Sequence, residues 1–249
     1  MTQSLFDLGG RVAIVTGASG GLGARFAATL AAAGASVIAC ARRLEPLERL
    51  AAEHPSVAAV RCDVTDDAQL RALVDDVVEL HGRIDVCVNN AGISSDGASD
   101  PDSFERVLEV NVRSVFALSQ LVAEPMLQQG RGSIVNISSM FGIVASSPVP
   151  EAAYVASKAA VNGLTRELGA QWAAAGVRVN ALAPGWFPTD MNAELFADER
   201  TANWVARTCP MGRVGRPDEL DGALLFLASD ASSYCTGQVI VIDGGWTLR

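Results

Sequence analysis

Histidine is scarce in this chain, whose 249 residues include only His54 and His81. Cysteine occurs five times, at widely spaced positions and without a Cys-x-x-Cys motif. Disulfide frameworks and zinc sites need paired or regularly spaced cysteines, and many metal sites also need histidines. We therefore expect no metal ion, no disulfide framework, and a reducing, cytoplasmic location.

An excess of basic residues and a long apolar run are also missing. The 19 Lys and Arg against 28 Asp and Glu give a net charge of −9. Nucleic acids and anionic membrane surfaces attract basic proteins, so we expect neither as a partner. A membrane helix needs about 20 mostly apolar residues, and the uncharged stretches 26–41 and 132–150 are interrupted by Gly, Ser, Thr or Pro. The amino terminus lacks the basic start of a secretory signal, so we expect a soluble protein.

Hydrophobic residues, by contrast, make up 49% of the chain, and short apolar runs alternate with longer helical patterns. The predicted strands are 11–15, 36–40, 57–61, 84–88, 133–137, 177–182 and 238–242. The predicted helices are 21–33, 44–53, 66–80, 103–126, 152–174 and 218–228. This alternation predicts an α/β fold with a doubly wound, parallel, seven-stranded sheet of the Rossmann type, as one domain over residues 1–249. The irregular segment 184–217 should lie at the carboxyl ends of the strands, where ligands bind in such sheets.

A glycine-rich turn follows the first predicted strand and opens the first predicted helix. Glycines let the backbone approach a pyrophosphate, and a helix amino terminus attracts its charge. The pattern predicts dinucleotide binding, although its spacing is GxxxGxG rather than GxGxxG. The same letters match the GxSxG motif of serine hydrolases, but that chemistry needs a later histidine and none follows His81. The turn's predicted cofactor-binding residues are Gly17, Ser19, Gly20, Gly21, Leu22 and Gly23.

The end of the second predicted strand bears on the choice of nicotinamide cofactor. NAD-binding chains usually carry an acidic residue there, for the ribose 2′-hydroxyl. Here Ala41 is neutral, and Arg42 and Arg43 follow. A guanidinium suits a 2′-phosphate, so we expect NADP(H) rather than NAD(H), with Arg42 the better candidate. The alternative is that both arginines only begin a solvated helix.

Tyr154 and Lys158 are four positions apart on a predicted helix and should share one face. An ammonium near a phenol favours the phenolate, so we expect the lysine to lower the pKa of the tyrosine toward working pH. Such a tyrosine serves as a general acid and base without any histidine. A serine-rich strand end at 136–139 precedes this pair, and a serine there can hydrogen-bond a substrate oxygen.

These features together resemble the classical short-chain dehydrogenase/reductase family from about Gly10 to Trp246. The resemblance rests on separate motifs in the expected order: Thr16–Gly23, Asp63 with Val64, Asn89–Gly92, Asn111, Ser139, Tyr154 with Lys158, Pro184 with Gly185, and Asp243–Gly245. The family's fold is the Rossmann type, its reaction is hydride transfer, and it is commonly a homotetramer.

The resemblance also implies roles for individual residues. Tyr154 would exchange a proton with the substrate oxygen. Lys158 would lower the pKa of Tyr154 and bind the nicotinamide ribose. Ser139 would orient the substrate, and Asn111 would hold a proton-relay water. Asp63 and Val64 would contact the adenine of the cofactor, and Phe187 and Thr189 would hold its carboxamide. The other residues expected to contact the cofactor are Asn90, Ala91, Gly92, Tyr154, Lys158, Pro184 and Gly185. No metal is implied.

One spacing departs from the family pattern. Ser139 and Tyr154 lie 15 positions apart (154 minus 139), farther than is usual in the family. This leaves Ser138 as an alternative, and Ser139 is chosen because Ser138 should point to the opposite face of its strand.

The segment about 186–212 is rich in large apolar residues and predicts a substrate lid that excludes water, with a subunit interface as the alternative. Its large apolar residues are Trp186, Phe187, Met191, Leu195, Phe196, Trp204 and Met211. The predicted activity is the NADP(H)-dependent interconversion of a ketone and a secondary alcohol of a small molecule. The alternatives are a 3-oxoacyl-carrier-protein reductase and a non-catalytic dinucleotide-binding sensor. The carrier protein is less favoured because it is acidic, and the regions that resemble its docking neighbourhood offer only Arg131.

Overall fold

The central feature of the computed structural model is one parallel sheet of seven strands. The structure describes residues 5–95, 97, 100–146, 150–189 and 199–248. The strands are β1 (Val12–Thr16), β2 (Ser36–Ala41), β3 (Val57–Arg61), β4 (Val86–Asn89), β5 (Gly132–Ile137), β6 (Val177–Pro184) and β7 (Val239–Ile242). Their order is β3-β2-β1-β4-β5-β6-β7, which confirms the predicted doubly wound sheet. The order reverses between β1 and β4, and ligands bind at such a switch point.

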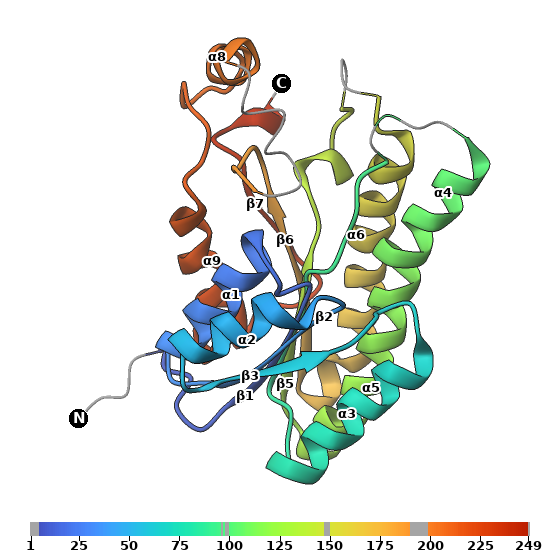
Figure 1. The fold of residues 1–249 in the computed structure, drawn as a ribbon, viewed down its shortest axis with the longest axis vertical. Helices are drawn as coiled ribbons and strands as arrows, with labels where there is room; N and C mark the ends of the chain where they lie inside the picture. The colour runs from blue at the N-terminus through green and yellow to red at the C-terminus, as the bar shows by residue number, and fades with distance from the viewer. Residues whose placement is uncertain (1–4, 96, 98–99, 147–149, 190–198, 249) are drawn as a thin grey trace.

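Helices cover both faces of the sheet (Figure 1). On one face lie α1 (Gly21–Ala32), α2 (Leu44–Glu53) and α9 (Asp221–Ala228). On the other lie α3 (Asp67–His81), α5 (Ser114–Gln129) and α6 (Ala152–Trp172). Two more helices, α4 (Pro101–Leu108) and α8 (Glu199–Thr208), lie toward the carboxyl ends of the strands. None of the helices within these described ranges is long and apolar enough to cross a membrane.

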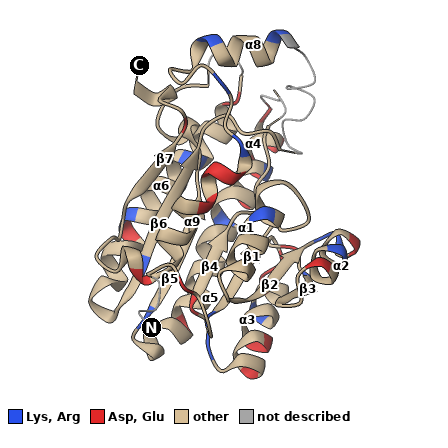
Figure 2. Ribbon diagram, turned by 90° about the vertical axis from the view of Figure 1, so that its left-hand side faces the viewer, with Lys and Arg blue, Asp and Glu red and all other residues tan. Residues whose placement is uncertain are grey.

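The core consists of two layers, one on each face of the sheet. In β1, Ala13 and Val15 belong to the layer under α1 and α9, whereas Val12 and Ile14 belong to the layer under α3 and α5. Successive side chains of a strand point to opposite faces. Both faces are buried here, which is why the strands are continuous apolar runs rather than alternating ones. Most charged side chains lie on the helices and loops around the sheet (Figure 2).

The helix predicted over 103–126 is interrupted in the structure. It divides into α4, a π-helical turn η1 (Glu109–Arg113) and α5. The turn surrounds Asn111, whose side chain is fully buried. Such turns often occur at functional sites, and a periodic apolar pattern does not reveal them. The helix α8 lies within the segment for which no element was predicted.

Candidate active site

A cleft of about 1050 Å³ runs along the carboxyl ends of the strands. The structure brings nearly all predicted site residues to its walls: Gly17, Ser19, Gly20, Gly21, Leu22, Gly23, Arg42, Asp63, Val64, Asn90, Ala91, Gly92, Ser139, Tyr154, Lys158, Pro184, Gly185, Phe187 and Thr189. Asn111 is the exception, because its side chain is buried behind the wall. The roles assigned to these residues stay predictions.

The glycine-rich turn forms a close-packed cradle at one end of the cleft. Gly17 has a φ of +66°, a conformation that favours glycine. A Cβ on Gly23 would lie 2.3 Å from the carbonyl oxygen of Gly17, so no larger residue fits there without a shift. The helix α1 begins at Gly21 without a side-chain cap and without an acidic residue in its first turn. Its free N–H groups and positive dipole end therefore suit the pyrophosphate of a dinucleotide.

Two polar side chains connect this turn to the end of β4. The Thr16 hydroxyl accepts hydrogen bonds from the backbone N–H groups of Asn90 and Ala91, each at 3.0 Å. The Asn90 amide donates to the carbonyl oxygens of Thr16 at 2.9 Å and of Gly17 at 3.3 Å. These bonds fix the glycine-rich turn after β1 against the loop after β4, at the point where the strand order reverses.

The adenosine end of the cleft is positively charged near the end of β2. Arg42 and Arg43 both line the cleft, and the Arg43 guanidinium donates a hydrogen bond to the Ser19 hydroxyl at 3.2 Å. Ala41, the last residue of β2, is neutral, so this position has no acidic side chain to repel a 2′-phosphate. The carboxylate of Asp63 accepts hydrogen bonds from the N–H and hydroxyl of Thr65. The residues present thus fit a 2′-phosphate, and Arg43 joins Arg42 as a candidate partner.

The predicted Ser–Tyr–Lys group meets where β5 ends beside α6. Ser139 and Tyr154 both line the cleft there, and Ser139 acts on the pKa of the Tyr154 hydroxyl. Ser138 points elsewhere, because its hydroxyl donates to the backbone carbonyl of Lys158 at 3.2 Å. Of the two serines, Ser139 is therefore the one beside the tyrosine hydroxyl. The Lys158 ammonium donates to the carbonyl oxygen of Ile137 at 2.8 Å.

Burial shifts the pKa values of Tyr154 and Lys158, and the shift of Tyr154 is opposite to the one predicted from the sequence. Burial raises the pKa of Tyr154 to about 12, although Ser139 acts in the opposite direction. Burial also lowers the pKa of Lys158 to about 8. The net shift of the Tyr154 pKa is therefore upward, opposite to the expected lowering toward working pH. Desolvation dominates, and the ammonium lies 5.4 Å from the centre of the Tyr154 ring, bound to a carbonyl rather than to the phenol.

Asn111 ties three parts of the site together. Its side-chain oxygen accepts from the Ile93 N–H at 2.8 Å, and its amide donates to the Ile93 carbonyl at 2.9 Å. The same amide donates to the Ser157 hydroxyl at 3.0 Å, which lies on α6 beside Lys158. In this structure the side chain fixes the loop after β4 against α6.

Aromatic rings gather beyond the strand ends. The Trp186 ring packs edge-on against Phe141, Trp204 and Trp246, with ring centres 5.5, 6.3 and 5.8 Å apart. Two of these rings, Trp186 and Trp204, belong to the predicted lid, whereas its residues Met191, Leu195 and Phe196 lie outside the described residues. The ring of Phe187 packs against Gly215, where a Cβ would meet it at 2.3 Å.

Comparisons with known proteins identify the family. A family model described as "Enoyl-(Acyl carrier protein) reductase" matches residues 17–247. A crystal structure of a short-chain type dehydrogenase/reductase from Mycobacterium marinum is 40% identical, covers 98% of both chains and superimposes with a TM-score of 0.94. The chain belongs to the short-chain dehydrogenase/reductase family.

Two further members of this family bear on the cofactor and the substrate. Galactitol 2-dehydrogenase (L-tagatose-forming) from Cereibacter sphaeroides is 40% identical over 99% of this chain and 98% of the relative. Gluconate 5-dehydrogenase from Burkholderia cenocepacia, solved with NADP and tartrate, is 38% identical, covers 98% of both chains and has a TM-score of 0.92. Both relatives are oxidoreductases of small hydroxylated molecules by name.

Several lining residues of this dehydrogenase/reductase were missed by the sequence reasoning. They come mainly from the loop after β4 and from α4 and η1: Ile93, Ser94, Arg106, Glu109 and Val110. The π-helical turn that brings Val110 to the cleft has no local sequence signal. The family motif Asn89–Gly92 could have drawn attention to the residues that follow it.

Proposed function

We propose that this protein is an NADP(H)-dependent oxidoreductase that interconverts a ketone and a secondary alcohol of a small molecule. The observation that carries the proposal is that Ser139, Tyr154 and Lys158 line the same cleft as the cradle for a dinucleotide. The galactitol and gluconate dehydrogenases that the chain resembles support this reaction type, and the NADP bound to the latter supports the cofactor.

The residues of this chain fit the proposed cofactor from end to end. The turn Gly17–Gly23 and the start of α1 would hold the pyrophosphate, and Arg42 and Arg43 the 2′-phosphate. Asp63 and Val64 would contact the adenine, and Asn90, Ala91 and Gly92 would line the middle. Pro184, Gly185, Phe187 and Thr189 would lie at the nicotinamide end. When bound, the cofactor supplies or accepts the hydride.

The chain's own residues would handle the proton. In the direction of reduction, the Tyr154 hydroxyl donates a proton to the substrate oxygen, and the Ser139 hydroxyl holds the same oxygen. A pKa of about 12 keeps that proton on the phenol until the substrate oxygen gains charge. The Lys158 ammonium lies close enough to the Tyr154 ring to stabilise the phenolate that forms. Asn111 would position a water that returns a proton to the site.

A carrier-protein substrate is less well supported, although the matching family model carries an acyl-carrier name. An acidic carrier needs a free basic patch beside the cleft. The regions 128–130 and 173–176, which resemble the docking neighbourhood, offer only Arg131, which lies at the amino end of β5 rather than beside the cleft and pairs with Asp85 at 3.3 Å. A small free substrate therefore fits better. The intact Asn111–Ser139–Tyr154–Lys158 set favours an enzyme over a dinucleotide sensor.

Three finer properties belong to the same proposal. We propose that residues about 186–212 act as a substrate lid, that the protein assembles as a homotetramer, and that it works in the cytoplasm without nucleic-acid or membrane partners. The aromatic contacts of Trp186 and Trp204 support the lid. Light scattering coupled to gel filtration tests the oligomer, with a mass near four times 25.9 kDa expected.

NADPH oxidation against a panel of ketoses, sugar acids and simple ketones tests the activity. We expect turnover with at least one carbonyl, and a lower rate with NADH than with NADPH. Binding of NADPH without turnover of any carbonyl or alcohol would favour the sensor instead.

A further inference from the structure

A second cavity, of about 370 Å³, adjoins the adenosine end of the cleft. Its described lining consists of Arg42, Arg61, Asp63 and Gln69. Arg42 and Asp63 also line the cleft, so the two spaces meet at these side chains. The proposed contacts to the cofactor do not include Arg61, which is the last residue of β3.

The pairing of β2 with β3 brings Arg61 to this place. The two strands are parallel, and Arg61 stands in register with Ala41. Residues in register on neighbouring strands point to the same face of a sheet. Position 41 is the one at which NAD-binding chains usually carry an acidic residue. A carboxylate there would lie beside Arg61 and neutralise it, whereas the neutral Ala41 leaves the Arg61 guanidinium available.

The other polar groups that line the second cavity are bonded within the chain. The Gln69 side chain accepts a hydrogen bond from the Asp63 N–H at 2.9 Å and donates one to Asp66 at 2.7 Å. The Asp63 Oδ1 accepts from the N–H and the hydroxyl of Thr65, at 3.1 and 2.8 Å. These bonds leave the two arginines as the main source of free donors in the described lining.

The guanidinium groups of Arg42 and Arg61 have no comparable partners. Neither makes an ion pair or a side-chain hydrogen bond with any part of the chain that the structure describes. Two arginines against the carboxylate of Asp63 give the described lining a net charge of +1 (2 minus 1). Unpaired positive charges that line one cavity favour a bound anion, and a phosphate monoester carries a charge of about −1.5 to −2 at pH 7.

We propose that Arg61 is a specificity-determining residue that binds the 2′-phosphate of NADP(H) together with Arg42. Arg43 lines the cleft and is bonded to Ser19 of the glycine-rich turn, whereas Arg61 approaches from β3 through the second cavity, and Arg42 borders both spaces. Two neighbouring strands, rather than the end of β2 alone, then select the cofactor. This inference rests on the proposed function and deepens its choice of cofactor.

Binding of the adenosine half of the cofactor tests the role of Arg61 without any substrate. Titration calorimetry gives the Kd for 2′,5′-ADP and for 5′-AMP, which differ only in the 2′-phosphate. The proteins are the wild type, Arg61→Ala, Arg61→Lys and Arg42→Ala. Arg71→Ala is the matched control, because Arg71 is exposed on α3, lies outside the described lining of both spaces, and its loss changes the net charge by the same amount.

We expect the wild type to bind 2′,5′-ADP at least about tenfold more tightly than 5′-AMP. In Arg61→Ala the Kd for 2′,5′-ADP should rise about tenfold and the Kd for 5′-AMP less than about twofold, because only the phosphate contact is lost. Arg61→Lys should recover part of the loss, since an ammonium keeps the charge without the planar donors. Arg71→Ala should bind both nucleotides as the wild type does. The kcat/KM for NADPH should fall in Arg61→Ala by the same factor as the affinity for 2′,5′-ADP, with NADH unaffected.

Two results overturn the inference while leaving the proposed function intact. One is wild-type affinity for 2′,5′-ADP in Arg61→Ala, with Arg42→Ala as the reference for a lost phosphate contact. The other is an equal loss of affinity for both nucleotides, which would show that Arg61 supports the end of β3 instead. A wild type that binds both nucleotides equally would contradict this inference and the proposed NADP(H) preference together. Loss of the preference in Arg61→Ala without turnover of any carbonyl would support the inference and contradict only the proposed reaction.

Discussion

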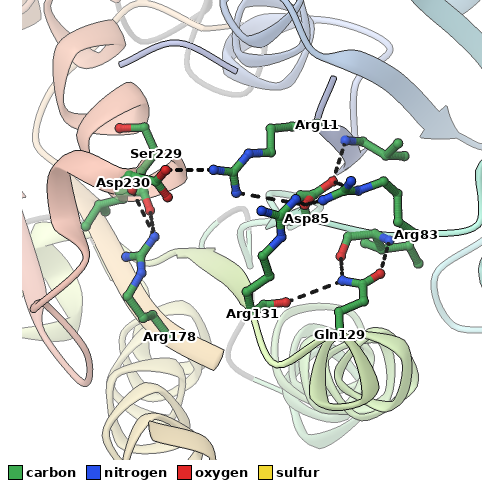
Figure 3. A network of polar contacts seen from close by, with 11 residues as sticks. Arg11, Arg83, Asp85, Gln129, Arg131, Arg178, Ser229 and Asp230 are labelled. Atoms are coloured by element: carbon green, nitrogen blue, oxygen red, sulfur yellow. Dashed lines mark hydrogen bonds and ion pairs between the residues drawn. The ribbon is translucent and has the colours of Figure 1, made fainter. Parts of the chain in front are cut away.

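At its amino edge the sheet holds a buried carboxylate surrounded by arginines (Figure 3), whereas at its carboxyl edge it opens into the cleft. Asp85, just before β4, has a fully buried side chain. It accepts hydrogen bonds from the Val12 N–H at 2.9 Å and from the Arg83 guanidinium at 2.6 and 2.8 Å. Arg131 adds a third partner at 3.3 Å. Both carboxylate oxygens of Asp85 are therefore hydrogen-bonded from within the chain.

The same edge is closed by a second set of arginine contacts. Arg11 bonds Asp230 at 2.8 Å, and Arg178 donates to the carbonyl oxygens of Leu227 and Ser229 at 3.0 and 3.1 Å. These bonds cap the end of α9 and fasten it to β1 and β6. A closed network of this kind stabilises the fold and offers nothing to a ligand.

The carboxyl edge keeps its donors available. The start of α1 has no side-chain cap, and Tyr154 and Ser139 line the open cleft, where a substrate oxygen can reach them. The residues that stabilise the fold and the residues proposed to carry out the reaction therefore lie at opposite ends of the same strands. Substitutions at one end should change unfolding, and substitutions at the other should change turnover.

The largest effect is expected for Tyr154→Phe. Loss of the proton donor should lower kcat at least about a thousandfold, since general acid–base catalysis contributes up to about 10⁴-fold. The Kd for NADPH and the Tm should stay near wild type. Steady-state kinetics measures kcat, fluorescence titration measures the Kd, and thermal unfolding measures the Tm. Tyr234→Phe is the control, because Tyr234 is the only other tyrosine in the sequence and its side chain is fully exposed. Residual activity within tenfold of wild type would remove Tyr154 from its proposed role.

At the opposite edge, Asp85→Asn should destabilise the fold by about 3 kcal/mol, because the buried carboxylate loses its charge and one of the two oxygens that accept hydrogen bonds from Val12, Arg83 and Arg131. Denaturant unfolding measures the change. Asp230→Asn serves as the comparison, because its side chain is 71% exposed and its loss should cost about 1 kcal/mol or less. If Asp85→Asn instead leaves the unfolding free energy intact and lowers kcat, the division between the two edges is wrong.

A smaller effect concerns cofactor choice. Arg42→Ala and Arg43→Ala should each lower kcat/KM for NADPH by roughly ten- to a hundredfold, with little change for NADH, since each removes a charged partner of the 2′-phosphate. Arg49→Ala on α2 is the control, because Arg49 pairs only with Glu45 on the surface. Equal losses with both cofactors would mean that these arginines support the loop rather than the phosphate.

The smallest effect is a pH dependence. Burial lowers the pKa of Lys158 from 10.5 to about 8, so the ammonium is present below about pH 8 and is lost as the pH rises through that value. The kcat/KM for ketone reduction should fall by about tenfold per pH unit above it. In Lys158→Arg the guanidinium stays charged, and the falling limb should move to higher pH. A flat wild-type profile up to pH 10 would contradict this role.

Much of the fold was predictable because its causes are local. Strands buried on both faces must be apolar throughout, and all seven were found within about two residues of their ends. The break in the helix over 103–126 was not predictable, because the π-helical turn at Asn111 is stabilised by Ile93, which is distant in sequence. The helix α8 was missed because it lies within the segment 184–217, which was interpreted as irregular as a whole since it is poor in strand signals.

The site was predictable in its membership and less so in its electrostatics. Glycine spacing and the Tyr154–Lys158 pair are visible in the letters of the sequence. The pKa of Tyr154 was predicted in the wrong direction, because spacing along a helix does not reveal how deeply the phenol is buried.

The Thr16 hydroxyl has a consequence for how this sequence can change over evolutionary time. One oxygen atom satisfies the N–H groups of Asn90 and Ala91, which lie more than seventy positions away. A valine at this position has the same shape but would leave the Ala91 N–H without this acceptor, and the Asn90 N–H would keep only the Val88 carbonyl oxygen at 3.1 Å. Because both donors are backbone groups, which no side-chain substitution at 90 or 91 removes, position 16 should keep a hydroxyl, as Thr or Ser, among descendants of this chain.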